Sequence, residues 1–108
     1  MLTEKDYCDY ETCVALEELG FPIRRIKVKE KEKHVPILLY EAHKWLREEH
    51  QLHIEVRYYQ NLWYEYELKE AEGKILAEGS AFKTYEDALS TAVYMATEHL
   101  KGKKYGRM

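Results

Sequence analysis

Hydrophobic and polar residues alternate most regularly between residues 53 and 69. In the first half, Ile54, Val56 and Tyr58 alternate with polar or charged residues. A period of two residues predicts a β-strand with one buried face. After Gln60-Asn61, the alternation resumes with an apolar set made of Leu62, Tyr64, Tyr66 and Leu68. We therefore predict a β-hairpin of strands 53–59 and 62–69. A third strand is predicted at 74–78, where Gly79-Ser80 ends it or introduces a bulge.

Three other segments repeat their apolar residues every three to four positions, which is typical of amphipathic helices. They span residues 10–19, 38–49 and 84 to about 101. Asp9 is suited to cap the first helix and Gly20 to end it. The residues expected to face the core are Cys13, Leu16 and Leu19 in the first helix, Leu39, Ala42 and Leu46 in the second, and Tyr85, Ala88, Leu89, Ala92, Ala96 and Leu100 in the third.

Residues 23–29 also alternate and predict a half-exposed strand, followed by a Lys-Glu repeat at 29–33 that we interpret as a solvated hairpin tip or loop. The predicted order is therefore α-β-α-β-β-β-α in a single α+β domain spanning 1–108. We expect an antiparallel sheet with the helices packed mainly on one face, and frayed termini at 1–8 and 102–108.

Composition narrows the class of protein. Of the 108 residues, 45% are hydrophobic and 34% charged, a mixture too apolar for a disordered chain and too charged for a membrane span. The first residues carry acids where a signal peptide needs positive charge, so we expect a cytoplasmic protein. In that compartment Cys8 and Cys13 would stay reduced and act as small buried hydrophobes. On one helix they would point about 140° apart.

Motifs with recognisable chemistry are missing from the sequence. It contains no phosphate-binding glycine loop, nucleophile elbow, CxxC pair or HExxH pair. His43, His50 and His53 are close in sequence, but helix-end or surface positions explain them without a metal. Cys8 lies just before the proposed cap and is the better candidate for a reactive thiol. We expect neither a metal, a cofactor nor an enzymatic activity.

The unusual feature is the aromatic content, with ten tyrosines and two tryptophans. Tyr58, Tyr64 and Tyr66 fit the core, with their hydroxyls at its rim. Strand alternation places a second set on the opposite face, made of His53, Arg57, Tyr59, Trp63 and Glu65. Mixtures of aromatic and charged side chains are typical of protein interfaces, so we predict a non-enzymatic module that binds a protein partner or a second copy of itself. The alternatives are an aromatic pair that only stabilises the open sheet, or one covered by the first helix.

Nucleic-acid binding is the alternative function. Its candidate segments, 24–33 and 101–107, are rich in bases, including Arg24, Arg25, Lys27, Lys29, Lys103 and Lys104. The net charge of −3 counts against a protein dedicated to binding duplexes. We expect no membrane partner.

Three motifs resemble those of a known group of proteins. They are Ala-Leu-Glu-Glu-Leu-Gly-Phe at 15–21, Leu-Tyr-Glu-Ala-His-Lys-Trp-Leu-Arg-Glu at 39–48 and Thr-Tyr-Glu-Asp-Ala-Leu at 84–89. In that order they resemble small uncharacterised proteins of bacteriophages and mobile elements of anaerobic gut bacteria, over residues 10–100. The basic stretch at 24–33 departs from that pattern. The resemblance implies no activity and favours an accessory protein that acts through contacts with another macromolecule.

Overall fold

The computed structural model describes residues 2–22, 25–28, 31–34 and 36–104. Its main sheet has three antiparallel strands, β3 (Leu52–Tyr59), β4 (Trp63–Glu70) and β5 (Ile75–Phe82), in the order β3-β4-β5. The turn between β3 and β4 works because Gln60 and Asn61 both adopt left-handed backbone conformations. The predicted hairpin and third strand are therefore confirmed.

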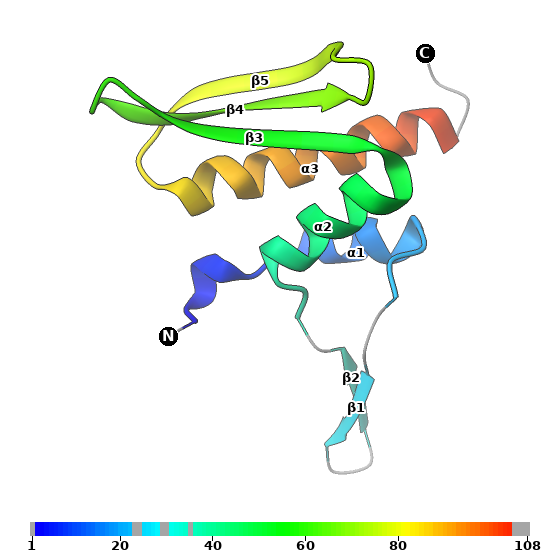
Figure 1. The fold of residues 1–108 in the computed structure, drawn as a ribbon. Coiled ribbons are helices and arrows are strands. Elements are labelled where there is room, and N and C mark those ends of the chain that lie inside the picture. Colours follow the sequence, from blue (N-terminus) through cyan, green and yellow to red (C-terminus); the bar gives the residue numbers. More distant parts are fainter. Residues whose placement is uncertain (1, 23–24, 29–30, 35, 105–108) are drawn as a thin grey trace.

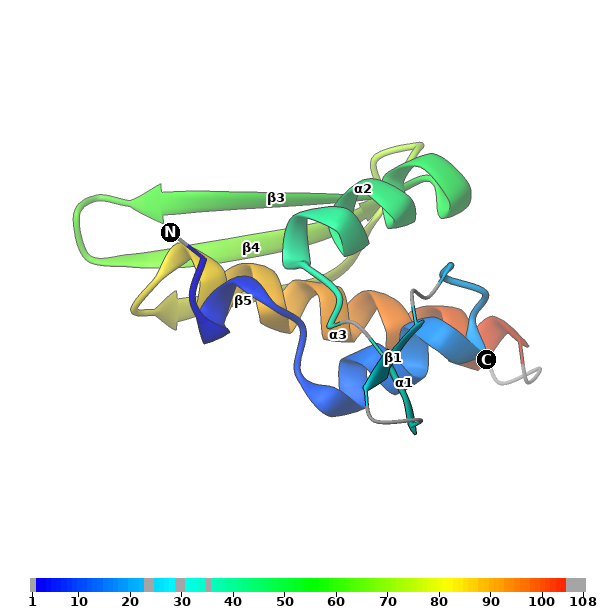
Figure 2. The same cartoon turned by 90° about the horizontal axis from the view of Figure 1, so that it is seen from below.

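Helices cover one face of this sheet (Figure 1). Helix α3 (Tyr85–Lys104) packs under all three strands, and α2 (Leu39–His50) packs beside it under β3. Helix α1 (Tyr10–Glu18) packs on α3 on the side away from the sheet, as Figure 2 shows from below. The close approach of α3 follows from its alanines, which leave room for the sheet residues above them. The predicted α+β class, with helices on one face, is confirmed.

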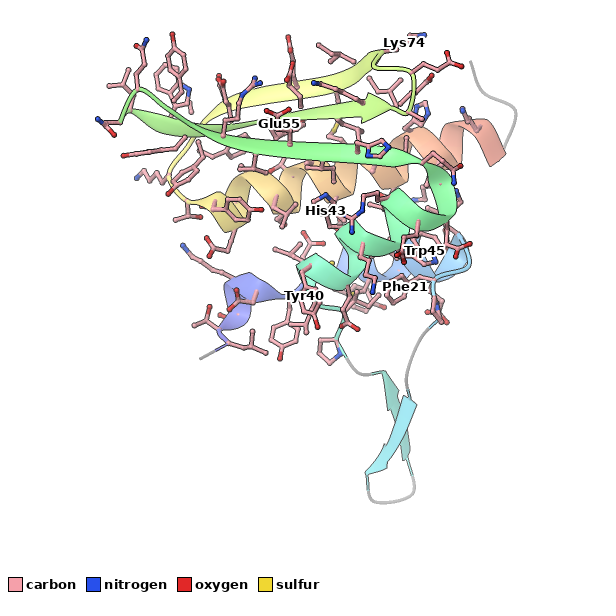
Figure 3. The ribbon with its side chains drawn as sticks, in the orientation of Figure 1. Phe21, Tyr40, His43, Trp45, Glu55 and Lys74 are labelled. Carbon is pink, nitrogen blue, oxygen red and sulfur yellow. The ribbon has the colours of Figure 1, made fainter. Side chains whose placement is uncertain are left out.

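The core lies between the sheet and the helices and contains most of the predicted residues. The fully buried side chains on the facing surfaces belong to Leu16, Ala42, Leu46, Leu68, Ala88, Ala92, Val93 and Ala96. Phe21 and Trp45 close its edge with an edge-to-face ring contact, at a centroid distance of 5.4 Å (Figure 3). Helical spacing of apolar residues thus identified the inner faces of the helices. Tyr85 is the exception: it is the first residue of α3 and is 44% exposed.

The N-terminal segment, which we expected to fray, is tied to the body. A short 3-10 helix, η1 (Glu4–Asp6), leads to a bridge between Tyr7 and Leu38. The amide of Cys8 donates a hydrogen bond to the carbonyl of Ile37 at 2.8 Å, and the Cys8 side chain is buried. At the other end, α3 continues past Gly102 to Lys104.

The segment between α1 and α2 differs from the prediction. Strands β1 (Arg25–Val28) and β2 (Lys31–His34) pair with each other and form a separate two-stranded ribbon. The ribbon extends away from the body (Figure 1), so β1 does not join the main layers. The Lys-Glu repeat was predicted as a tip or loop, but its second half is strand β2; residues 29 and 30 lie outside the described part.

Strand β5 runs on through Gly79 to Phe82 with irregular pairing to β4, so of the two predicted alternatives the bulge is confirmed and the strand end is not. One detail of the main sheet differs from the prediction. Leu62 was predicted on the buried face, but Tyr59 pairs with Trp63, which leaves Leu62 in the turn and 64% exposed. A three-residue loop, one residue longer than the predicted one, causes this change.

Candidate functional site

The face of the sheet opposite the helices is the candidate site. Within the described residues no helix covers this face, and in Figure 3 its side chains, Glu55 among them, stand away from the body. The β3–β4 register defines four cross-strand rows along it: Tyr59 with Trp63, Arg57 with Glu65, Glu55 with Glu67, and His53 with Lys69. All five predicted interface residues therefore lie on this open face, as strand parity requires.

The row at the hairpin end is an aromatic stack. The rings of Tyr59 and Trp63 lie nearly parallel, with centroids 5.6 Å apart and an interplanar angle of 21°. Tyr59 is 40% exposed and Trp63 is half-buried. The indole Nε1 of Trp63 is shielded from solvent and has no hydrogen-bond partner among the described residues. Because α1 packs on α3, the alternative in which the first helix covers these rings is wrong.

The next rows form a network of ion pairs around Arg57. Its guanidinium lies 3.2 Å from a carboxylate oxygen of Glu55, 3.4 Å from Glu65 and 3.0 Å from Glu67. Lys69 approaches Glu55 at 3.6 Å and Glu67 at 3.5 Å. The glutamates that follow the aromatic row are thus held by cations of the same face, which accounts for them without acid–base chemistry.

Aromatic and apolar side chains also gather on the other side of the hairpin end. Tyr58 stacks obliquely on Tyr64 at a centroid distance of 4.7 Å, and Tyr64 meets Tyr85 edge to face at 6.4 Å. Tyr58 was predicted to be buried, but it is 55% exposed. The reason is that the hairpin extends beyond the first residue of α3, so no helix lies under the part of the hairpin next to its turn (Figures 1 and 2). We call Tyr58, Tyr59, Leu62, Trp63 and Tyr64 the hairpin end.

The structure brings four of the five predicted residues together and separates the fifth. Two adjacent rows next to the turn hold Tyr59, Trp63, Arg57 and Glu65. His53 lies in the row farthest from the turn, beyond Glu55 and Glu67. Sequence analysis missed Tyr58 and Leu62 as exposed members of the hairpin end. Their exposure depends on the length of the turn and on how far the turn passes the start of the last helix. The hydrophobic pattern alone gives neither.

The basic segments of the alternative function do not form one surface. Arg25 and Lys27 belong to the projecting ribbon, whereas Lys103 lies near the end of α3, at a separate place on the molecule (Figure 1). Lys104 ends α3. Arg24 and Lys29 lie outside the described residues. A single nucleic acid contacting both segments would have to pass along the helical side of the body.

The two cysteines lie side by side. The Cys13 thiol donates a hydrogen bond to the Cys8 carbonyl oxygen, at an Sγ–O distance of 3.6 Å. The predicted divergence of about 140° assumed one helix. It is wrong because Cys8 precedes the cap Asp9 and lies in extended backbone. The hydrogen bond from Cys8 and a backbone hydrogen bond from Ile37 lower the pKa of the Cys13 thiol to about 6, whereas the pKa of Cys8 is raised.

The other candidate chemistry is dispersed. His50 contacts Trp45 at the end of α2, and burial lowers the pKa of His43. In the described part of the chain, no three histidine, cysteine or acidic side chains are grouped in a way that could hold a metal ion. Among the same residues, no helix combines the length and the apolar character needed to cross a membrane.

Comparisons of this chain with family models, with curated proteins and with solved structures gave no match. The resemblance of the three motifs to proteins of bacteriophages and mobile elements therefore stays a prediction. The proposals below rest on the chain's own geometry.

Proposed function

We propose that this protein is a non-enzymatic interaction module that binds a protein partner through the hairpin end and the adjoining rows of the open sheet face. The observation that carries the proposal is the exposed Tyr59–Trp63 stack next to Arg57. Tyrosine, tryptophan and arginine are the residues that contribute most often to protein–protein binding energy. Tyr58, on the other face, and Leu62, in the turn, add exposed apolar surface at the same end of the sheet.

Charge indicates the chemistry of the partner. Four glutamates lie on or beside the open face, Glu55, Glu65, Glu67 and Glu78, and among the described residues the first three pair with Arg57 and Lys69. A complementary surface would place an apolar or aromatic side chain on the hairpin end and a lysine or arginine over the glutamates. Acidic partners and nucleic acid phosphates would be repelled from the same rows.

Alanine variants of the exposed tyrosines test the proposal. Tyr59→Ala removes half of the stack, while Tyr40→Ala removes an equally large side chain that is 65% exposed on α2, away from the sheet (Figure 3). Wild type and both variants are immobilised, and the proteins they retain from a lysate of the source organism are quantified. Each retained protein is then purified and titrated directly.

We expect Tyr59→Ala to weaken binding of a specific partner by about tenfold or more, which is typical of a central aromatic residue, and Tyr40→Ala to leave it unchanged. Circular dichroism verifies that both variants are folded. Equal binding by all three proteins would refute the proposal.

Self-association is a separate outcome that molar mass decides. Light scattering over a wide range of concentrations would show a dimer that Tyr59→Ala dissociates if the partner is a second copy. Nucleic-acid binding through the ribbon is tested by gel retardation of short RNA and DNA duplexes at low salt, where phosphate contacts are strongest. Retardation that is lost on raising the salt and unaffected by Tyr59→Ala would favour the alternative function instead.

A further inference from the structure

The pairing of Cys8 with Cys13 follows from the way α1 begins. Asp9 is the N-cap, and its carboxylate accepts a hydrogen bond from the amide of Thr12 at 2.8 Å. Cys8 therefore occupies the residue before the cap, and Cys13 the fourth residue of the helix. In many helices apolar side chains at these two positions pack against each other and fix the entry of the chain. Here both side chains are thiols.

Backbone pairing with residues 37 and 38 holds the Cys8 side of this pair in place. The Cys8 amide is bonded to the carbonyl of Ile37, and the adjacent Tyr7 pairs with Leu38. Cys8 is buried and contributes to the wall of a groove that also includes Asp9 and Ser90. Cys13 is half-buried on the first turns of α1, so its sulfur retains access to small molecules.

We propose that Cys8 and Cys13 form a redox site that exchanges with a low-molecular-weight disulfide to give an intramolecular disulfide bond. The basis is the position of the two residues on either side of the cap Asp9 and the 3.6 Å approach of the Cys13 sulfur to the Cys8 carbonyl oxygen, which place the two side chains next to each other at the start of α1. This site is independent of the hairpin end, which lies on the opposite side of α3 from α1.

The exchange takes place in two balanced steps. Cys13 is the attacking residue, because its sulfur is the more exposed and its pKa of about 6 leaves it as a thiolate near neutral pH. Its thiolate attacks one sulfur of the small disulfide, forms a mixed disulfide and expels a thiolate, which takes up the proton that Cys13 lost. The Cys8 thiol then gives up its proton and its sulfur attacks the Cys13 sulfur, expelling the second small thiol. The protein loses two hydrogens, and the small disulfide is reduced to two thiols.

Mass spectrometry of the whole chain tests this inference. The folded protein is incubated with oxidised glutathione, remaining thiols are blocked with N-ethylmaleimide, and the intact mass is measured. We expect a main product that carries no maleimide, is lighter than the reduced chain by two hydrogens, and yields a peptide linking Cys8 to Cys13. Two maleimide adducts, a lasting glutathione adduct on the wild type, or a disulfide-linked dimer would each overturn the proposal.

Two controls test whether the folded structure prepares the reaction or whether any two thiols this close in sequence would react equally fast. In urea the pair loses its fixed geometry, so we expect bond formation to slow by about tenfold or more. The same rate in folded and unfolded protein would show that the structure does not prepare the site. Cys8→Ser should trap glutathione on Cys13, whereas Cys13→Ser should react slowly at buried Cys8; the opposite order would overturn the assignment of Cys13 as the attacking residue. Circular dichroism confirms that each variant is folded.

Discussion

Gly79 on β5 provides a quantitative test of the packing above α3. A Cβ atom built on this glycine would lie 2.7 Å from Cε1 of Tyr66 and 3.3 Å from Cε2 of Phe82. Real Cβ atoms do not approach other atoms within 3.0 Å. Tyr66 is only 4% exposed, so its ring cannot swing into solvent to relieve the clash. Gly79→Ala should therefore displace the Tyr66 ring within the packed core, which lowers the free energy of unfolding.

The size of the effect follows from two opposing contributions. Overpacking a core by a methyl group costs about 1–3 kcal/mol. Replacing glycine by alanine inside a strand returns about 0.5–1 kcal/mol, because the unfolded chain loses flexibility. The net destabilisation of Gly79→Ala is therefore about 0–2.5 kcal/mol, which for a domain of this size lowers Tm by up to roughly 10–20 °C. Thermal and urea unfolding followed by circular dichroism measure both quantities.

A double-mutant cycle assigns the loss to the ring. Gly79→Ala is introduced into wild type and into Tyr66→Leu, which lacks the ring, and should cost much less in the second background. Gly73→Ala is the matched control: its φ of +94° gives it a backbone penalty, but nothing lies within 4 Å of its Cβ position. Its effect should be the same in both backgrounds. If Gly79→Ala costs the same in both backgrounds, the described contact between Gly79 and Tyr66 is wrong.

The remaining predictions concern α1, the core and the buried histidines. Asp9→Ala removes the acceptor for the Thr12 amide and should destabilise the protein by about 1 kcal/mol in urea unfolding, whereas Asp9→Asn should restore most of that loss. Leu46→Ala leaves a cavity at a fully buried position and should cost about 2–5 kcal/mol in the same assay, and a cost under 1 kcal/mol would contradict the described core. Burial lowers the pKa of His43 and of His99 below 6.5, so the unfolded chain binds more protons under mild acid. The free energy of unfolding should therefore fall from about pH 7 to about pH 5. The double variant His43→Gln/His99→Gln should show a smaller fall, and an unchanged fall would exclude these groups as its cause.

Strand parity and helical spacing were sufficient to predict the layers of this protein. Ile54, Tyr66 and Leu68 are buried while Glu55 and Arg57 are exposed, because side chains on a strand must point alternately to either face. The same reasoning placed the five interface residues on one face. The local pattern is sufficient here because the burial of a side chain depends only on the helix or strand that carries it and on which face of that element meets the core.

The features that the sequence did not reveal depend on where elements end relative to one another. The exposure of Tyr58 follows from the distance by which the hairpin passes the start of α3, and that of Leu62 from one additional loop residue. The contact between Cys8 and Cys13 arises because the chain changes from extended to helical at Asp9. The ribbon of β1 and β2 was only half predicted, since β1 has alternating apolar residues but β2, Lys-Glu-Lys-His, has no hydrophobic pattern to indicate a strand.

The arrangement of charge on the open face explains why contact is expected at one end of the sheet. Arg57 and Lys69 already satisfy Glu55, Glu65 and Glu67, so a partner covering the central rows would have to remove water from paired ions for little gain. These charges also discourage other sheets from packing on this face. The hairpin end carries no such pairs and exposes apolar rings, so burying it costs little desolvation and removes apolar surface from water. A partner that neutralises the surplus glutamates at its rim and buries the hairpin end at its centre would gain from both properties, which is why we place the centre of the contact on the hairpin end and not across the whole sheet.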